Sequence, residues 1–320
     1  MPSEFNLIKK YFTRPYTQAD LGVGDDAALI QVSPGNQLAI STDMLVAGTH
    51  FLVDCKAWDI GWKSLAVNLS DMAAMGATPK WATLSIALPN VDEVWLAEFS
   101  KGFFACADKF GVGLIGGDTT RGPLNISVQI MGEVPNGKAL QRDRAQAGDE
   151  IWVSGTLGEA ALGLAYLQNK LEAHTLSVKE IELCVDALQQ PEPRIALGLA
   201  LRDIAHSAID VSDGLIADLG HVLTQSQLGA DLYWEKIPHV HVNETLDAAT
   251  LQSFSLAGGD DYELCFTAPP TMHKEILKIG DKLDLKLSPI GITTLGSTLN
   301  IFDAHHQRIE LKAAGYDHFS

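Results

Sequence analysis

The sequence predicts a two-domain protein of the α/β class, in which each domain combines helices with a mixed sheet of the α+β kind. Three observations lead to this prediction. The chain has 320 residues, enough for two compact units. Its composition, 46% hydrophobic and 20% charged, is typical of folded proteins without low-complexity tracts. Strand-like runs and stretches of helical periodicity alternate in both halves of the chain.

The N-terminal half opens with a predicted amphipathic helix over residues 4–13. A longer helix is expected over 57–75, because apolar side chains recur there at steps of three and four residues and Gly76 marks its end. The other elements expected in this half are strands at 27–32 and 38–42, a strand at 81–88, a helix at 92–110 and strands at 112–115 and 125–134.

Residues 135–148 are rich in Gly, Gln and charge, and they are the best candidate for a linker. This predicts domains at 1–137 and 149–320. A strand that begins at Ile151 is expected to open the second domain. Its remaining expected elements are helices at 158–168, 177–189, 194–206 and 215–227 and strands at 230–234, 262–267, 287–292 and 298–302.

The chain is acidic, with 40 Asp and Glu against 23 Lys and Arg, a formal net charge of −17. Such a field repels nucleic-acid backbones and anionic membrane surfaces, so neither is an expected partner. The four cysteines are scattered without a CxxC pair, which favours reduced thiols over disulfides or zinc. The first residues do not form a signal peptide, and no apolar run approaches the roughly 20 residues of a membrane helix. We therefore expect a soluble, cytoplasmic protein.

Aspartates recur beside Gly, Ser or Thr, next to apolar runs, in five separate places. Glycine lets the backbone approach a ligand closely, and consecutive N–H groups can hold a phosphate. Carboxylates are the hard oxygen ligands that Mg²⁺ takes together with nucleotide phosphates. The pattern therefore predicts several Mg²⁺ ions that bridge phosphates to the protein, at the clusters 22–26, 41–43, 116–121, 210–214 and 258–263.

Each cluster also has a structural interpretation, because a single Gly-Gly-Asp is usually a turn and Asp213-Gly214 could simply open a helix. Asp71 alone could be an exposed helix residue. However, Ser64, Asn68 and Asp71 form a polar stripe at helical spacing, distinct from the Trp and Leu face, on a helix that is otherwise apolar from Leu65 to Met75. The five clusters together favour a metal–phosphate site.

Two other patterns are set aside. Residues 132–139 nearly match a P-loop, but Ala139 lacks the hydroxyl that binds magnesium and no helix pattern follows. The histidine pairs at 239/241 and 305/306 have no Cys or His partners at metal spacing, so zinc is not expected. His50 differs only in that it follows the Asp43 cluster closely, and taken alone a buried structural histidine is the better interpretation.

The sequence resembles the thiamine-monophosphate kinase family of the aminoimidazole-ribonucleotide synthetase-like superfamily. The resemblance covers nearly the whole chain and rests on six segments in the family's order and spacing. These are GVGDDAA (22–28), STDMLVAGTHF (41–51), NLSDMAAMGA (68–77), GGDTTRG (116–122), DVSDGL (210–215) and GGDDYEL (258–264).

The resemblance implies two α/β domains, with the N-terminal ATP- and Mg²⁺-binding domains of two chains paired in a homodimer. It implies transfer of phosphate from ATP to thiamine monophosphate, giving thiamine diphosphate. The Mg²⁺ positions match Asp26, Ser41, Thr42, Asp43, Asp71, Asp118, Asp210 and Asp213. The ATP contacts match Gly117, Asp118, Arg142 and Ser212, and the contacts to thiamine monophosphate match His50, Asp260 and Tyr316. The catalytic set would be Asp118, Arg142 and Asp213.

Two departures from the family pattern affect the substrate contacts. Asp260 stands where the family usually has Glu, a carboxylate one methylene longer. Near the C-terminus, Phe319 is a rival to Tyr316 as the aromatic residue of the family pattern. Because the acceptor is a phosphate monoester with a second pKa of about 6, no strong general base is needed. We expect direct in-line transfer without a phosphoenzyme.

Two other functions remain open from the residues themselves. One is another ATP-dependent reaction of the same superfamily, such as activation of an amide or of selenide. The selenide reaction expects a reactive cysteine in the N-terminal region, and the first cysteine here is Cys55. The other is an acidic, cation-binding partner protein that does not turn over ATP.

Overall fold

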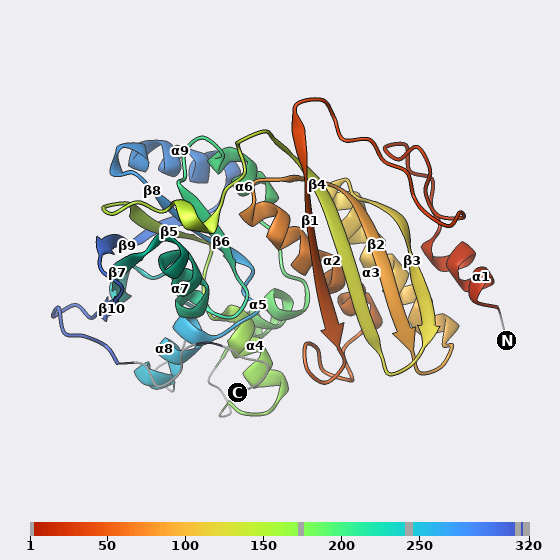
Figure 1. Cartoon of the computed structure of the whole chain (residues 1–320). Helices are drawn as coiled ribbons and strands as arrows, with labels where there is room; N and C mark the ends of the chain where they lie inside the picture. Colours follow the sequence, from red (N-terminus) through yellow and green to blue (C-terminus); the bar gives the residue numbers. More distant parts are fainter. Residues whose placement is uncertain (1–2, 172–175, 241–245, 311–314, 316–320) are drawn as a thin grey trace. The chain divides into compact units, whose positions relative to one another are not determined.

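The computed structural model describes residues 3–171, 176–240, 246–310 and 315. The chain divides into two compact units (Figure 1). Unit 1 comprises Met1–Met72 and Ala77–Gly137, and unit 2 comprises Ala73–Gly76 and Lys138–Ser320. Each unit contains one mixed sheet with helices, which confirms the predicted α/β class.

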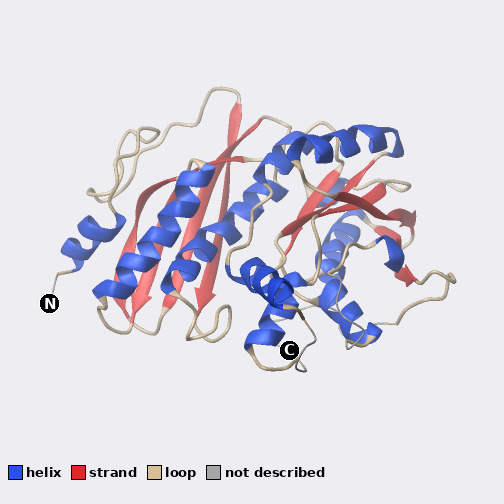
Figure 2. Ribbon diagram, turned by 180° about the vertical axis from the view of Figure 1, so that it is seen from behind, coloured by secondary structure: helices blue, strands red, loops and turns tan. Residues whose placement is uncertain are grey.

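Unit 1 is built on a four-stranded sheet with the order β1-β4-β2-β3. Strand β4 is antiparallel to both β1 and β2, whereas β2 and β3 are parallel. Helices α2 and α3 lie side by side on one face of this sheet (Figure 2). The elements of the unit are α1 (Glu4–Leu7), η1 (Ile8–Phe12, a π-helix), β1 (Asn36–Val46), α2 (Ala57–Ala74), β2 (Thr78–Leu88), α3 (Glu93–Phe110), β3 (Gly113–Arg121) and β4 (Asn125–Pro135).

Helices α2 and α3 pack with their backbones almost in contact. A Cβ on Gly61 would lie 2.1 Å from the carbonyl oxygen of Phe99, and one on Gly102 would lie 1.9 Å from that of Trp58. The apolar stripe predicted for α2 lies in the core, where Leu65 and Leu69 are fully buried. The apolar stripe of α2 packs onto the sheet. Because this fixes the orientation of the helix, the polar residues of α2 lie at defined positions along β1.

Unit 2 is built on a six-stranded sheet with the order β10-β7-β9-β5-β8-β6. All neighbouring pairs are antiparallel except β10 and β7, which are parallel. Its strands are β5 (Glu150–Ser154), β6 (Ser207–Val211), β7 (Leu228–Tyr233), β8 (Glu263–Ala268), β9 (Leu287–Leu295) and β10 (Leu299–Phe302). Its helices are η2 (Arg142–Arg144), α4 (Glu159–Leu167), α5 (Val178–Gln189), α6 (Ile195–Leu201), α7 (Leu215–Ser226), η3 (Trp234–Lys236), α8 (Ala248–Ala257), η4 (Pro270–Met272) and α9 (His273–Leu283).

Helices cover both faces of the unit 2 sheet. On one face, Leu215 and Leu219 of α7 pack with Val153, Val211 and other strand residues. On the other face, α6 and α9 pack against Trp152 and its neighbours on β8. The central strand β5 is therefore buried on both sides, and it reads as a continuous apolar run in the sequence.

Several sequence-based expectations about the elements were wrong. Residues 27–32 do not form a strand, and Leu29 makes only an isolated bridge to Leu21. The helix expected over 194–206 stops at Leu201, and strand β6 at 207–211 was not expected. Helices α8 and α9 were not expected, and the helix at 4–13 turns into a π-helix after Leu7. Within the described residues, no helix has the length and apolar character needed to span a membrane.

Candidate active site

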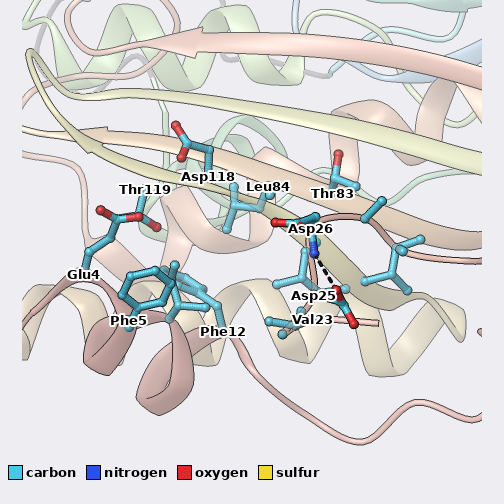
Figure 3. Close-up of a pocket in the computed structure, with 18 residues that line it drawn as sticks. Glu4, Phe5, Phe12, Val23, Asp25, Asp26, Thr83, Leu84, Asp118 and Thr119 are labelled. Atoms are coloured by element: carbon cyan, nitrogen blue, oxygen red, sulfur yellow. Dashed lines mark hydrogen bonds between the residues drawn. The ribbon is translucent and has the colours of Figure 1, made fainter. Parts of the chain in front are cut away.

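A cavity of about 550 Å³ lies in unit 1, against the edge of the sheet formed by β3 (Figure 3). One wall is apolar and includes Phe5 and Phe12 of the N-terminal helices. The carboxylates of Asp26 and Asp118 also line the cavity. The structure therefore brings these two predicted metal ligands into one depression, next to apolar surface that can receive part of a ligand.

Glycines allow the backbone to lie open at this cavity. Gly117 has φ +146°, and a Cβ there would lie 1.8 Å from the carbonyl oxygen of Leu84 on the paired strand. Only glycine fits at this position. The Gly-Gly-Asp segment lies within strand β3 and is not a loop. Asp118 follows directly and is exposed to solvent. On the opposite side, Asp25 accepts a hydrogen bond of 3.0 Å from the N–H of Asp26.

The predicted polar stripe of α2 meets strand β1. The hydroxyl of Ser41 donates a 2.6 Å hydrogen bond to the Asp71 carboxylate. The N–H of Asp43 donates to the side-chain oxygen of Asn68, at 3.1 Å, and Asn68 is fully buried. Side chains alternate along a strand, so Ser41 and Asp43 share the α2 face. The Ser41 and Asp43 segment is therefore fixed to α2 by polar side chains.

Thr42 lies between these residues and belongs to the other face of the sheet. Its hydroxyl donates a 3.0 Å hydrogen bond to the carbonyl oxygen of Val128 on β4. The hydroxyl is therefore occupied within the sheet, and an oxygen of Thr42 that serves a metal on the α2 side would come from its backbone.

His50 lies in the turn after β1. Its Nδ1 accepts a hydrogen bond of 3.0 Å from the N–H of Val46, so in the neutral ring the proton sits on Nε2. In the neutral His50 ring, Nε2 is therefore the hydrogen-bond donor.

In unit 2, Asp210, Ser212 and Asp213 follow one another at the carboxyl end of β6. Asp210 is the penultimate residue of the strand and is 5% exposed. Asp218, on the first turn of α7, lies beneath Ser212 and Asp213. One of its oxygens accepts hydrogen bonds of 3.0 Å from the N–H groups of both Ser212 and Asp213.

Asp218 was not among the residues singled out from the sequence. Burial raises its pKa to about 7, and the N–H groups of Asp213 and Ser212 and the charge of Arg142 act in the opposite direction. Arg142, a predicted ATP contact, therefore has its guanidinium charge near this loop. Its backbone is also held there, because the hydroxyl of Ser226 donates to the Arg142 carbonyl at 2.9 Å.

Asp260 lies in the segment before β8, with φ +70°. The hydroxyl of Tyr262 donates a 3.1 Å hydrogen bond to the Asp260 carboxylate and orients it. Tyr262 also has a positive φ, of +50°. Left-handed backbone at two non-glycine residues is uncommon and is concentrated at functional sites.

A second acidic cluster lies behind this segment. Glu263 is 5% exposed and forms a two-pronged ion pair with Arg194, and it also accepts a hydrogen bond from Ser154. Glu159 lies nearby, where burial and the charge of Glu263 raise its pKa to about 7. The sequence signal for this group was weak, because Arg194 and Glu263 are 69 residues apart.

The donors brought together are oxygens, from carboxylates and hydroxyls, and this chemistry fits a hard cation such as Mg²⁺. Across the described parts of both units, no three His, Cys, Asp or Glu side chains gather closely enough to hold a metal ion. Magnesium bound with a nucleotide takes only one or two carboxylates, since phosphates and water supply the other oxygens. The pair Asp26 and Asp118 has this character. Tyr316 and Phe319, the two rival aromatics, lie outside the described residues.

Family models match most of the chain. Residues 24–134 match the N-terminal domain of the AIR synthase related proteins, and residues 146–303 match the C-terminal domain of the same family. Among curated proteins, the thiamine-monophosphate kinase of Escherichia coli K12 is 44% identical over 327 aligned residues, covering 99% of this chain and 98% of the relative. The enzyme of the same description from Bacillus subtilis is 31% identical, covering 99% of both chains.

Solved structures give the same picture. The thiamine-monophosphate kinase of Stenotrophomonas maltophilia is 48% identical, with a TM-score of 0.83, and the match covers 89% of this chain and 91% of that one. AaThiL complexed with AMPPCP and TMP is 28% identical, with a TM-score of 0.74, and the match covers 90% of this chain and 89% of that one.

Proposed function

This chain belongs to the AIR synthase related proteins and, among them, to the thiamine-monophosphate kinase family, and from that premise we propose that it phosphorylates thiamine monophosphate with ATP. The products are thiamine diphosphate and ADP. The observation that carries the proposal is the full-length match to thiamine-monophosphate kinases, supported by a related structure that holds AMPPCP and TMP. AMPPCP is an ATP analogue, so the bound pair corresponds to the two substrates.

Each set of residues has a proposed role. Gly117, Asp118, Arg142 and Ser212 are the proposed contacts to ATP. His50, Asp260 and Tyr316 contact thiamine monophosphate. The proposed Mg²⁺ ligands are Asp26, Ser41, Thr42, Asp43, Asp71, Asp118, Asp210 and Asp213, all oxygen donors.

The phosphoryl transfer does not require a strong general base to deprotonate the acceptor. The acceptor phosphate is largely a dianion at neutral pH and attacks the γ-phosphorus directly, while the bridging oxygen of ADP leaves in line. The chain's own task is to bring two anions together and hold them in that geometry. Mg²⁺, when held by these oxygen ligands, would supply positive charge that offsets the charge of the phosphates. The guanidinium of Arg142 can stabilise the negative charge that spreads over the transferring phosphoryl group in the transition state.

The chain is further proposed to act as a homodimer through unit 1. Among the described residues of the unit, no helix covers the face of the sheet opposite α2 and α3 (Figure 1). Ile40 and Met44 of β1 belong to this open face and are 56% and 54% exposed. An exposed apolar face of this kind favours pairing with a second copy.

The proposal is tested by the formation of thiamine diphosphate from thiamine monophosphate, ATP and Mg²⁺ with the purified chain. We expect product from the monophosphate, none from free thiamine, and loss of product with EDTA. ADP release without thiamine diphosphate would move the function to another reaction of the same family. Metal binding with no ADP release would favour the non-enzymatic alternative.

The in-line step has its own test. In a single turnover with γ-labelled ATP, the label should pass to thiamine diphosphate without a protein-bound stage. A covalent phospho-aspartate or phospho-histidine on the chain would overturn direct transfer.

A further inference from the structure

Two loops of unit 2 lie at the same end of neighbouring strands of its sheet. Strands β6 and β8 are antiparallel, and Val211 pairs with Glu263. The chain leaving β6 therefore runs beside the chain entering β8. We call these segments the 212–214 loop and the 258–262 loop. The first carries Ser212 and Asp213, proposed to contact ATP and Mg²⁺, and the second carries Asp260, proposed to contact thiamine monophosphate.

The two loops are joined through their backbones. The N–H of Asp260 donates to the carbonyl oxygen of Ser212, and the N–H of Tyr262 donates to that of Val211, both at 2.8 Å. A Cβ on Gly259 would lie 2.5 Å from the Ser212 carbonyl oxygen. Another on Gly214 would lie 2.8 Å from the carbonyl carbon of Ala257. With no side chain between them, one loop cannot shift without moving the other.

Asp218 holds the 212–214 loop from below. It is 4% exposed, and a single oxygen of its carboxylate receives the N–H groups of Ser212 and Asp213. Helix α7 has Gly214 at its N-cap and no side-chain capping bond. The Asp218 carboxylate therefore supplies the acceptor that fixes the entry to α7.

Asp261 holds the 258–262 loop from the other side. Its carboxylate accepts hydrogen bonds from the N–H groups of Gly158, at 2.8 Å, and Ala160, at 3.4 Å, in the first turn of α4. Asp261 lies between the two left-handed residues Asp260 and Tyr262. Such a conformation persists only where the surroundings hold it in place, and the attachment to α4 does so.

We propose that Asp218 and Asp261 are positioning residues that fix the two loops as one hydrogen-bonded unit, so that the ATP contact at Ser212 and the substrate contact at Asp260 are set together. The roles of these two contacts rest on the proposed function. The joined loops do not, because they follow from hydrogen bonds and backbone contacts within unit 2.

The kinetic test uses Asp218→Ala and Asp261→Ala. Each should raise the KM for ATP and the KM for thiamine monophosphate, by about tenfold. In the double variant, the loss in kcat/KM should be smaller than the product of the single losses, because both changes loosen one unit. If Asp218→Ala changed only the KM for ATP and Asp261→Ala only that for thiamine monophosphate, the loops would be independent and the proposal wrong.

Conservative variants and a matched control separate positioning from general destabilisation. Asp218→Asn keeps one oxygen that can accept both N–H groups, so its KM values should return close to those of the unsubstituted chain. Asp261 accepts with both of its oxygens, and an Asn side chain has only one. The KM values of Asp261→Asn should therefore return only in part to those of the unsubstituted chain. Asp92→Ala removes a similar carboxylate, which accepts from Val94 and Trp95 at the start of α3. It should lower the melting temperature and leave both KM values unchanged.

Amide hydrogen exchange tests the joined loops without any assay of activity. In Asp218→Ala, exchange should accelerate in the 258–262 loop as well as in the 212–214 loop, and Asp92→Ala should affect neither. Acceleration confined to the 212–214 loop would overturn the proposal. If the chain made no thiamine diphosphate, the proposed function would fail, while this measurement would still decide whether the loops move together.

Discussion

Asp71 is proposed to serve the site rather than to support the fold. It lies on α2, and its carboxylate accepts a hydrogen bond from the hydroxyl of Ser41 on β1. A neutral amide has nearly the same shape and can accept the same bond. A metal–phosphate site would need the charge of Asp71, whereas the hydrogen bond from Ser41 does not.

We expect Asp71→Asn to reduce kcat by about 100-fold or more, because a carboxylate near the transferring phosphates is lost. The melting temperature should stay nearly constant, and scanning calorimetry with a coupled ADP assay measures both. Asp108→Asn, at an exposed position of α3, should be fully active. An active Asp71→Asn enzyme would remove Asp71 from the proposed metal ligands.

Tyr262 offers a narrower test at the substrate side. Tyr262→Phe removes only the hydroxyl that donates to Asp260. A hydrogen bond to a charged group contributes about 1.5–3 kcal/mol, so the KM for thiamine monophosphate should rise by about tenfold or more. The KM for ATP should not change, since the backbone bonds between the loops remain. Steady-state kinetics that showed equal effects on both substrates would contradict an orienting role for this hydroxyl.

At the residue scale, the sequence pointed to aspartates beside Gly, Ser or Thr, because those residue types suit phosphates and Mg²⁺ by their chemistry alone. It could not point to Asp218, which has no such neighbours and acts by accepting N–H groups that only the folded loop presents. Glu263 lies in the cluster 258–263, but its ion pair with Arg194 was missed because the two residues are 69 positions apart in the chain. The roles proposed for the predicted site residues remain predictions.

At the scale of elements, Glu133 connects strand β4 to the turn that precedes β1. It is 4% exposed and accepts hydrogen bonds from Ser33 and Asn36, and Lys80 forms an ion pair with it at 2.9 Å. Burial alone raises the pKa of this carboxyl. The N–H of Ser33, together with Lys80 and Asn36, outweighs burial and lowers the pKa from 4.5 to about 2.

Glu133→Gln should therefore lower the free energy of unfolding at pH 7 by about 1–3 kcal/mol, as expected for the loss of a buried hydrogen-bonded charge. Because the folded pKa is depressed, the stabilisation is complete above pH 4.5 and is lost as the pH falls towards 2. Urea unfolding at several pH values should show the variant and the unsubstituted chain converging below pH 4. Glu98→Gln, which breaks only an exposed ion pair, should cost less than about 0.5 kcal/mol.

The errors at this scale have identifiable causes. Residues 27–32 have the composition of a strand, but a strand needs a ladder partner, and Leu29 makes a single bridge to Leu21. The helix expected over 194–206 is too long by five residues at its C-terminal end, and β6, a strand of only five residues, was not predicted at all. Long elements with strong periodicity, such as α2 and α3, were predicted to within a few residues.

At the scale of the whole molecule, the proposed homodimer makes a direct prediction. Ile40→Glu with Met44→Glu would place two charges on the open face of the unit 1 sheet. We expect the mass in solution to fall from twice the 34.5 kDa of one chain to a single chain, as measured by light scattering. Leu295→Glu, at an 86% exposed position of unit 2, is the matched control and should leave the mass unchanged. A unit 1 variant that remains paired would place the dimer interface elsewhere.

The fold class could be predicted because alternating strand and helix patterns occur in both halves of the chain. The order of strands in the sheets could not, since periodicity describes one strand at a time. Identification of thiamine as the substrate rested on the resemblance of six motifs, and the family matches confirm that resemblance. Composition alone reached only a metal–phosphate site.

The strand order of unit 2 also has a consequence for synthesis on the ribosome. Strand β5 ends at Ser154, but both of its partners, β8 and β9, lie more than 100 residues further along the chain. At a translation rate of about 5–20 residues per second, the apolar strand waits on the order of ten seconds for them. During that time Trp152 and its neighbours form an unpaired hydrophobic segment. The nascent chain should therefore depend on holding chaperones until β9 has emerged, far more than a protein assembled from local hairpins.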